Sequence, residues 1–203
     1  MTKIKICGMM CSEDIDAVNG VKPDYIGFVF AKGRKRTVTH ETAALLKSKL
    51  DPDIKAVGVF LNNEIEEVLQ LVESGTIDII QLHGDEDEQY IKMVRQHTDK
   101  TIIKAVSVRT SEDILLAEKL DVDFLLLDTY KKGLIGGTGE VFDWNTIPEI
   151  QKPYFIAGGL NEGNIKAALK YGAYGLDVSS GAETDGRKDR QKIINIVKTV
   201  RSG

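Results

Sequence analysis

An aspartate followed by a glycine-rich segment is the part of the sequence that most directly suggests chemistry. The apolar run Phe124–Leu127 ends at Asp128, and glycines follow at positions 133, 136, 137 and 139. A short, bounded apolar run is typical of a strand buried on both faces of a parallel sheet, which would place Asp128 at the strand's carboxyl end. The glycines predict a loop that can close over a ligand and exclude water. Taken alone, the segment is better explained by a carboxylate that caps a turn, so a functional interpretation depends on the rest of the chain.

A cysteine ends the first apolar run. Alternation along a strand at residues 3–7 places Lys3, Lys5 and Cys7 on one face and two isoleucines on the other. We expect the isoleucines to pack under helices and Cys7 to point into the same site as Asp128, above the lysines. A thiolate stabilised by nearby cations can act as a base or a nucleophile. A small buried residue is the commoner role of a lone cysteine, and it is our interpretation of Cys11.

A basic segment and two glycine- and serine-containing segments could bind anions. Four cations lie in the stretch Lys32-Gly-Arg-Lys-Arg36, which is usually a solvated loop. At the rim of a site, an arginine would hold a carboxylate or phosphate best, because its planar fork donates two parallel hydrogen bonds. Glycines let backbone N–H groups approach an anion closely, which favours a phosphate site at Gly158, Gly159, Asp177, Ser179 and Ser180. His83 could line the same pocket, but a structural histidine is the simpler interpretation.

Strand-like apolar runs alternate with helical patterns along the whole chain. The predicted strands are 3–7, 25–30, 55–60, 79–83, 102–106, 124–128, 154–157 and 175–178. Predicted helices begin at Ser12, Thr39, Asn63, Asp85 (with Glu88 as a capping box), Thr110 or Ser111, Asn161 (ending at Gly172) and Asp189 (to about Val200), and 144–150 is a candidate short helix.

Eight strand–helix units in about 200 residues predict a compact α/β protein, a (β/α)8 TIM barrel in which residues 1–203 form a single domain. Active sites of such barrels lie at the carboxyl ends of the strands, where the residues above are expected. An open doubly wound sheet is the alternative, but it would usually carry a dinucleotide fingerprint after the first strand, and none is present there.

Composition excludes several classes of function. The chain has 203 residues, 42% hydrophobic and 29% charged, with a formal net charge of -4, so a general nucleic-acid surface is not expected. No apolar run is long enough for a membrane span and no signal peptide is visible, which predicts a cytoplasmic protein. Two cysteines and three scattered histidines indicate neither a disulfide framework nor a metal site.

A thiol base and a carboxylic acid across a barrel mouth suit proton transfer next to a carbonyl or imine. With a phosphate site beside them, and with no metal or cofactor expected, they predict an isomerase of a phosphorylated metabolite. The residues alone do not identify the substrate.

The ordered motifs resemble those of the phosphoribosylanthranilate isomerase family of tryptophan biosynthesis. They are Lys5-Ile-Cys-Gly8, Gly27-Phe-Val-Phe30, Val57-Gly-Val-Phe60, Gln81-Leu-His-Gly84, Leu127-Asp128, Gly136-Gly-Thr-Gly139, Phe142-Asp-Trp144, Gly158-Gly-Leu160 and Asp177-Val-Ser-Ser-Gly181. Each motif is weak by itself, but the set in this order is specific.

The resemblance implies an aldose–ketose type of isomerisation, the Amadori rearrangement of N-(5-phosphoribosyl)anthranilate to 1-(2-carboxyphenylamino)-1-deoxyribulose 5-phosphate, without a cofactor. By similarity, Asp128 is the general acid and Cys7 the general base. Arg36 would bind the anthranilate carboxylate, and the phosphate loops, whose motif includes Asp177, would hold the substrate phosphate.

Two other functions stay open at this point. One is another phosphosugar isomerase, although a strand that ends in Cys7 argues against the related enzyme of histidine biosynthesis, which uses two aspartates. The other is a non-catalytic module that binds a phosphorylated ligand. We expect a small phosphosugar as the partner, no nucleic acid and no membrane, and a monomer, with a homodimer as the alternative.

Overall fold

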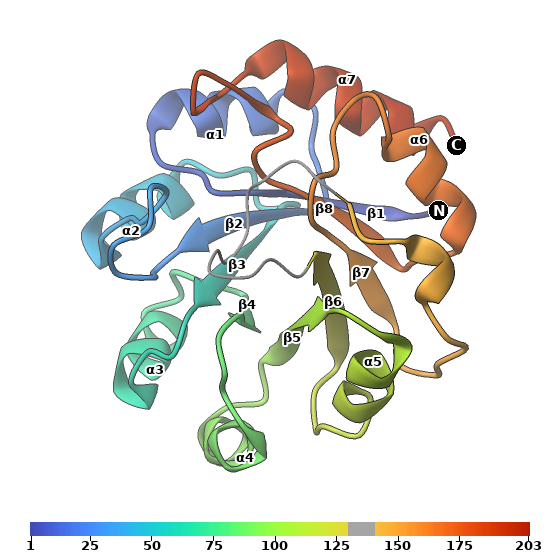
Figure 1. The fold of residues 1–203 in the computed structure, drawn as a ribbon. Helices are drawn as coiled ribbons and strands as arrows, with labels where there is room; N and C mark the ends of the chain where they lie inside the picture. Colours follow the sequence, from blue (N-terminus) through green and yellow to red (C-terminus); the bar gives the residue numbers. More distant parts are fainter. Residues whose placement is uncertain (130–140) are drawn as a thin grey trace.

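The structure is a computed structural model that describes residues 1–129 and 141–203. The loop glycines predicted at positions 133, 136, 137 and 139, and with them the expected closing loop, lie outside these residues. Within the described part, eight parallel strands close into a barrel and helices surround it (Figure 1). No helix of the described part is long and apolar enough to cross a membrane.

The strands follow one another around the barrel in chain order, and the first also pairs with the eighth. Their bounds are β1 Lys3–Cys7, β2 Tyr25–Val29, β3 Lys55–Phe60, β4 Ile79–Leu82, β5 Thr101–Val108, β6 Phe124–Thr129, β7 Tyr154–Ile156 and β8 Gly175–Val178. The (β/α)8 prediction is therefore confirmed. The open doubly wound sheet is wrong, because β8 pairs with β1 and each of the eight strands therefore has a hydrogen-bonded neighbour on both sides.

Helices lie between successive strands over most of the circuit. They are α1 Ser12–Asn19, α2 His40–Ser48, α3 Ile65–Glu73, α4 Glu88–His97, α5 Ser111–Ala117, α6 Ile165–Ala168 and α7 Arg190–Arg201, with 3-10 turns η1 Trp144–Thr146 and η2 Leu169–Tyr171. A short antiparallel hairpin, β9 Glu183–Thr184 and β10 Arg187–Lys188, separates β8 from α7.

Three predicted helix starts are wrong: that of α3 by one position, that of α4 by two and that of α6 by three. The α4 cap is Asp87, whose side chain accepts a hydrogen bond from the Tyr90 N–H, and not Asp85. The α3 cap is Glu64, because the Asn63 side chain is used elsewhere: it accepts from the Leu61 N–H and donates to the Phe30 carbonyl.

The third shifted start is that of α6, which begins after Asn164 and not at Asn161. The Asn161 amide instead donates to the carbonyl of Gly159, within the turn that follows β7. The predicted end at Gly172 is confirmed, since this glycine caps η2 in the left-handed region at φ 65°. The shifted starts leave the strands, and therefore the site, where the sequence placed them.

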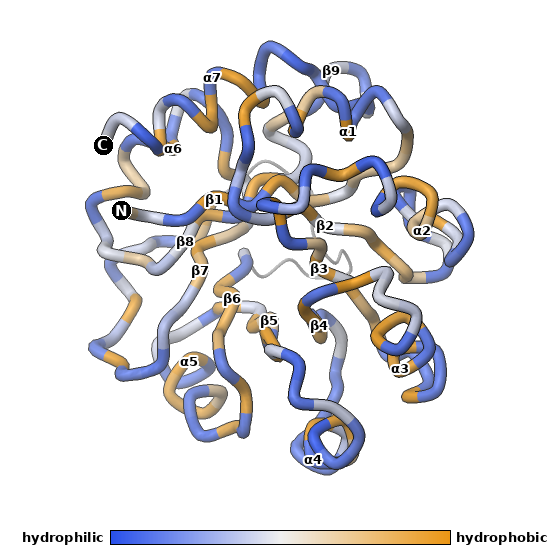
Figure 2. The backbone as a smooth tube through the Cα atoms, turned by 180° about the vertical axis from the view of Figure 1, so that it is seen from behind, coloured by the Kyte–Doolittle hydropathy of each residue, from blue (hydrophilic) through white to orange (hydrophobic). Residues whose placement is uncertain are grey.

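The apolar side chains form two clusters on opposite sides of the barrel wall. The larger cluster lies between strands and helices and includes Ile4 and Ile6, both fully buried, as the alternation in β1 predicts. The smaller cluster comprises Cys7, Val57, Val59, Ile103, Leu126, Phe155 and Ala157. Figure 2 shows that the apolar stretches of the chain follow the strands and the inner sides of the helices. Side chains fill the barrel interior, and the open space lies above them at one end.

Candidate active site

A cavity of about 490 Å³ lies at the carboxyl ends of the barrel strands. It is lined by Cys7, Val29, Ala31, Gly33, Arg34, Lys35, Arg36, Val59, Leu61, Gln81, His83, Asp128, Ala157, Gly158, Gly159, Leu160, Asp177, Ser179 and Ser180. Every residue that the sequence assigned to the site is in this set. The structure thus brings together side chains from β1, β4, β6 and β8 and from the loops after β2 and β7.

Cys7 ends β1 and sits against a strand that leaves it room. Its register partner on β2 is Gly27, and a Cβ at that position would lie 2.6 Å from the Cys7 sulfur. The thiol is 7% exposed at the base of the cavity. Burial raises its pKa, whereas Lys5 acts to lower it, Asp177 to raise it and Lys188 to lower it. The interpretation of Cys11 as a small buried residue is wrong, because this cysteine is exposed at the start of α1.

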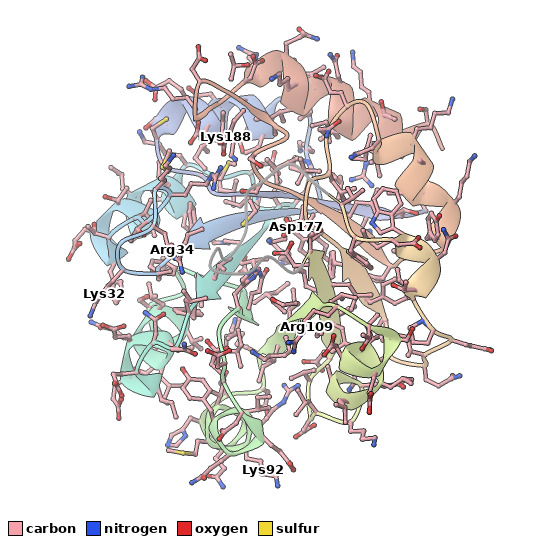
Figure 3. All side chains as sticks on the ribbon, in the orientation of Figure 1. Lys32, Arg34, Lys92, Arg109, Asp177 and Lys188 are labelled. Atoms are coloured by element: carbon pink, nitrogen blue, oxygen red, sulfur yellow. The ribbon has the colours of Figure 1, made fainter. Side chains whose placement is uncertain are left out.

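A buried ion pair lies directly below the cavity. The Lys5 ammonium is 2.9 Å from Asp177 Oδ2, and the two side chains are 0% and 8% exposed. The other carboxylate oxygen, Oδ1, is buried without a hydrogen-bond partner among the described residues. A carboxylate oxygen of this kind at a cavity wall can accept a hydrogen bond from a ligand. Figure 3 places Asp177 near the middle of the barrel mouth.

Asp128 is held by its own backbone and by a histidine. Its Oδ1 accepts a hydrogen bond from the Thr129 N–H at 2.7 Å, and Oδ2 lies 3.2 Å from His83 Nε2. The other ring nitrogen, Nδ1, is 2.8 Å from the Gln81 amide nitrogen. Since an amide N–H₂ can only donate, this places the hydrogen of a neutral ring on Nε2, from where it is donated to Asp128. His83 therefore contacts the predicted acid directly, which the sequence did not indicate.

Arg36 lies over the cavity, but its fork already holds a carboxylate. Nε and Nη2 donate to the two oxygens of Glu183 at 2.5 and 2.7 Å. Glu183 also accepts a hydrogen bond from the Lys188 ammonium at 2.6 Å. Gly8 makes room for the arginine, since a Cβ there would lie 2.5 Å from Arg36 Cδ and its φ is 90°. Neither Glu183 nor Lys188 was predicted for the site.

The predicted phosphate loops are shaped by glycines and by two asparagines. Gly158 and Gly159 have φ of 78° and 70°, a region that L side chains rarely adopt. The side-chain amides of Asn161 and Asn164 both donate to the Gly159 carbonyl, each at 3.0 Å. The N–H of a trans peptide points opposite to its carbonyl, so these bonds also fix the direction of the Leu160 N–H.

The second loop, after β8, lies beside the first one. Asn161 and Gly181 form an isolated parallel bridge. The Ser179 hydroxyl donates to the Cys7 carbonyl at 3.3 Å, and the Ser179 carbonyl accepts from Lys188 at 3.0 Å. Ser179 and Ser180 both line the cavity. In phosphate-binding barrels, the loops after strands seven and eight supply the phosphate site, and these two loops meet that description.

The residues that sequence reasoning missed are Glu183, Lys188 and the contact of His83 with Asp128. A signal existed for the first, because Glu183 follows the Asp177–Gly181 motif by two positions, but its partner Arg36 is 147 positions away. No group of three or more histidine, cysteine or acidic side chains suited to hold a metal occurs in residues 1–129 and 141–203.

The fold and the cavity define a (β/α)8 barrel with a carboxylate, a thiol and two glycine- and serine-containing loops around one cavity at its mouth. Comparison with known proteins narrows this class. The family model described as N-(5'phosphoribosyl)anthranilate (PRA) isomerase matches residues 4–199. The chain is 47% identical over 203 residues to an N-(5'-phosphoribosyl)anthranilate isomerase of Endomicrobium trichonymphae, covering 100% of both chains. It is 44% identical to that of Acetivibrio thermocellus, covering 99% of this chain and 96% of the relative.

Solved structures agree with these relatives. Phosphoribosyl anthranilate isomerase from Thermus thermophilus superposes with a TM-score of 0.86 at 28% identity, covering 99% of both chains. A phosphoribosyl anthranilate isomerase in complex with reduced 1-(o-carboxyphenylamino)-1-deoxyribulose 5-phosphate superposes with a TM-score of 0.82 at 29% identity and full coverage of both chains. The chain belongs to the phosphoribosylanthranilate isomerase family.

Proposed function

We propose that this protein catalyses the reaction of its family in tryptophan biosynthesis, the Amadori rearrangement of N-(5'-phosphoribosyl)anthranilate, with Asp128 as the general acid and Cys7 as the general base. Family membership over residues 4–199 supports the reaction. The observation that carries the two roles is that both side chains line one cavity, from strands β1 and β6.

The reaction needs one proton given and one proton taken. Asp128 gives its proton to the furanose ring oxygen, the bond from this oxygen to C1 breaks, and a protonated imine forms between C1 and the anthranilate nitrogen. Cys7 then takes the proton from C2, and the electron pair of the broken C–H bond moves into the imine. The resulting enolamine tautomerises to the ketone. The substrate nitrogen accepts the electron pair, so the steps proceed without an external electron acceptor.

Arg36 is our candidate for binding the anthranilate carboxylate. Glu183 uses the Nε–H and one N–H of Nη2. A guanidinium has five N–H donors, so three donors of Arg36 stay available for a second carboxylate. Glu183 then orients the fork while the substrate binds its free edge, or the substrate displaces it. In both cases the pairing of Glu183 with Lys188 keeps this carboxylate charged and in place.

We assign the substrate phosphate to the backbone of Gly158 and Gly159 and to Ser179 and Ser180. The positive φ of the two glycines and the direction imposed on the Leu160 N–H by the asparagine amides support this assignment. Asp177 is a neighbour of this loop, but its pairing with Lys5 favours a role near the thiol over a role in phosphate binding. His83 is assigned to holding Asp128, through the Nε2 contact, rather than to binding substrate.

Turnover of freshly prepared phosphoribosylanthranilate tests the proposal, followed by the loss of its anthranilate fluorescence. We expect catalysis above spontaneous decay by the wild type, and loss of most of kcat in Cys7→Ala and in Asp128→Asn with unchanged circular dichroism. Cys11→Ser is the matched control for the first variant and should turn over normally. Near-normal turnover by a folded Cys7→Ala or Asp128→Asn would remove that residue from the mechanism. A folded wild type without turnover would contradict the function itself.

We also propose that the protein is a monomer. The exposed large apolar side chains of the described part are scattered over several elements, as Leu45 on α2, Met93 on α4 and Leu115 and Leu116 on α5. A similar structure from Thermotoga maritima is described as generated monomers of a dimeric isomerase, so a dimer is the alternative. Sedimentation velocity over a range of protein concentrations decides between the two, and a concentration-independent dimer mass would refute the monomer.

A further inference from the structure

We propose that Lys5 is a positioning residue that stabilises the thiolate of Cys7 from inside the barrel, without touching the substrate. The proposal rests on the role of Cys7 as the base, given above. It adds a residue that prepares this base and names the arrangement that does so: an ammonium buried below the thiol and tethered to Asp177.

The position of Lys5 rules out a direct role in binding. Its side chain is fully buried and is not part of the cavity wall, whereas Cys7, two positions further along β1, is part of it. Residues two positions apart in a strand point to the same side of the sheet, so the side chains of Lys5 and Cys7 both point into the barrel interior. The Lys5 ammonium donates a hydrogen bond to Asp177 Oδ2 at 2.9 Å, and its charge acts on the Cys7 thiol two positions further along the same strand face. Lys5 can therefore reach the reaction only through these two groups.

Burying an ammonium costs desolvation free energy, so a lysine in the core needs a partner of opposite charge. Asp177 supplies one carboxylate oxygen at 2.9 Å, and the other oxygen has no hydrogen-bond partner among residues 1–129 and 141–203. A pair that served stability alone would have both carboxylate oxygens satisfied, because each unpaired polar atom in a core lowers stability. An ammonium that is paired with a carboxylate, shares a strand face with a thiol and is closed off from water is instead suited to stabilise negative charge on the sulfur.

The charges around Cys7 support this conclusion. Lys5 on β1 and Asp177 on β8 form one pair. Glu183 and Lys188 lie in the hairpin after β8, and Arg36 lies in the loop after β2. The Glu183 carboxylate pairs with both of these cations. From β2 the thiol faces Gly27, which has no charge. These groups together carry three positive and two negative charges, so one further negative charge balances them.

Burial alone would keep the thiol protonated, and burial is the largest influence on the pKa of Cys7 in this structure. Lys5 is the largest influence that lowers this pKa, ahead of Lys188. Without Lys5 the sulfur would face burial and the Asp177 carboxylate together, and both favour the neutral thiol. The base would then be ionised in a smaller fraction of molecules at neutral pH.

The test measures the ionisation of Cys7 directly, in a Cys11→Ser background that leaves one thiol in the chain. The rate of alkylation by iodoacetamide is followed by mass spectrometry as a function of pH, and the ultraviolet absorbance of the thiolate is recorded in parallel. We compare Lys5→Met with Lys3→Met. Lys3 is the matched control because it lies on the same face of β1 but pairs with Asp24 at the far end of the strand, 2.8 Å away.

For Lys5→Met we expect the midpoint of the alkylation profile to rise by about one unit or more, the range for loss of an adjacent opposite charge. Lys3→Met should match the parent. The acidic limb of the kcat/KM profile should move with the alkylation midpoint. If Lys5→Met unfolds because Asp177 is left unpaired, Lys5→Met/Asp177→Asn removes both charges, and its midpoint should still rise, since Lys5 has the larger influence on Cys7.

The proposal is overturned if Lys5→Met, or the folded double variant, has the same alkylation midpoint as Lys3→Met. Lys5 would then be a structural residue only. Failure of the proposed function would appear as a folded wild type without turnover, and failure of the role of Cys7 as the base would look different again. In that case Cys7→Ala would retain turnover, while the Lys5-dependent shift in alkylation could still be present.

Discussion

Replacement of Gly158 by alanine should displace the proposed acid, and the chain contains a control for the accompanying strain. A Cβ at Gly158 would lie 2.5 Å from Asp128 Oδ1 and 2.6 Å from the Thr129 N, with the Thr129 hydroxyl closer still. Real Cβ contacts shorter than 3.0 Å are essentially absent, so Asp128 or the loop must move by about half an ångström or more. The backbone adds a second penalty, because φ at this position is 78°.

The two penalties can be separated by Gly172→Ala. Gly172 has a similar φ of 65°, but a Cβ there has no atom within 4 Å. Both variants should lose roughly 1–2 kcal/mol to the left-handed backbone. Gly158→Ala should lose about 1–3 kcal/mol more to overpacking. Its kcat should fall by about 100-fold, the effect expected when a reacting group is misplaced by up to 1 Å.

The assay pairs urea denaturation with turnover of phosphoribosylanthranilate under conditions in which both variants are folded. We expect Gly172→Ala to be less stable but nearly as active per folded molecule as the wild type. Equal kcat values for Gly158→Ala and Gly172→Ala would refute the reasoning, because they would mean that the position of the Asp128 carboxylate does not limit the reaction.

Three further predictions concern other charged groups. Arg36→Met should raise KM by about 10–100-fold with a smaller change in kcat, as expected for loss of charged hydrogen bonds worth ~1.5–3 kcal/mol, and steady-state kinetics with an unchanged KM would contradict the carboxylate role. Burial raises the pKa of Asp24, but the hydrogen bond from Lys3 and other partners lower it overall. Its stabilising effect is thus complete above the unfolded pKa of about 3.9 and is lost as pH falls through the folded value, so in urea denaturation Asp24→Asn should lose about 1 kcal/mol at pH 7 and less at pH 3. Lys104→Met leaves the buried Glu86 without its partner at 2.8 Å, and it should lower the free energy of unfolding by about 3–5 kcal/mol, whereas Lys104→Met with a normal Tm would contradict the pairing.

The fold could be predicted because its signals are local. Each apolar run is bounded and each is followed by a helical pattern, so the number and order of strands follow from counting. Helix starts were less predictable where a side chain bonds outside its own helix. Asp85 looked like a cap, yet the neighbouring Glu86 turns inward to accept hydrogen bonds from the N–H groups of Asn62 and Gly84. This buried turn moves the cap to Asp87.

The site was predictable to the extent that a barrel gathers its strand ends. Cys7, Asp128 and the phosphate loops needed only the strand positions and the parallel topology. The partners of these groups needed distances that the sequence does not contain. Arg36 pairs with Glu183, and Lys188 acts on the pKa of Cys7, because the hairpin after β8 brings Glu183 and Lys188 to this side of the barrel mouth. Figure 3 shows Lys188 on the side of the barrel covered by α1 and α7.

The charges around Cys7 differ from those around Asp128, and the difference favours Cys7 as the base and Asp128 as the acid over the reverse assignment. The thiol lies among Lys5, Lys188 and Arg36, three cations that share two carboxylates. Burial opposes a negative charge on the sulfur, and Lys5 and Lys188 reduce the cost of the charge that a departing proton leaves there. If the thiol instead supplied the proton and the carboxylate took one, the cations would act against the return of the proton to the sulfur after each turnover. The other side holds Asp128 by hydrogen bonds, from the Thr129 N–H and from a His83 ring that is itself bonded to Gln81. No lysine or arginine of the described residues pairs with Asp128, whereas the thiol lies among three cations, and this difference supports the carboxyl as the acid and the thiol as the base.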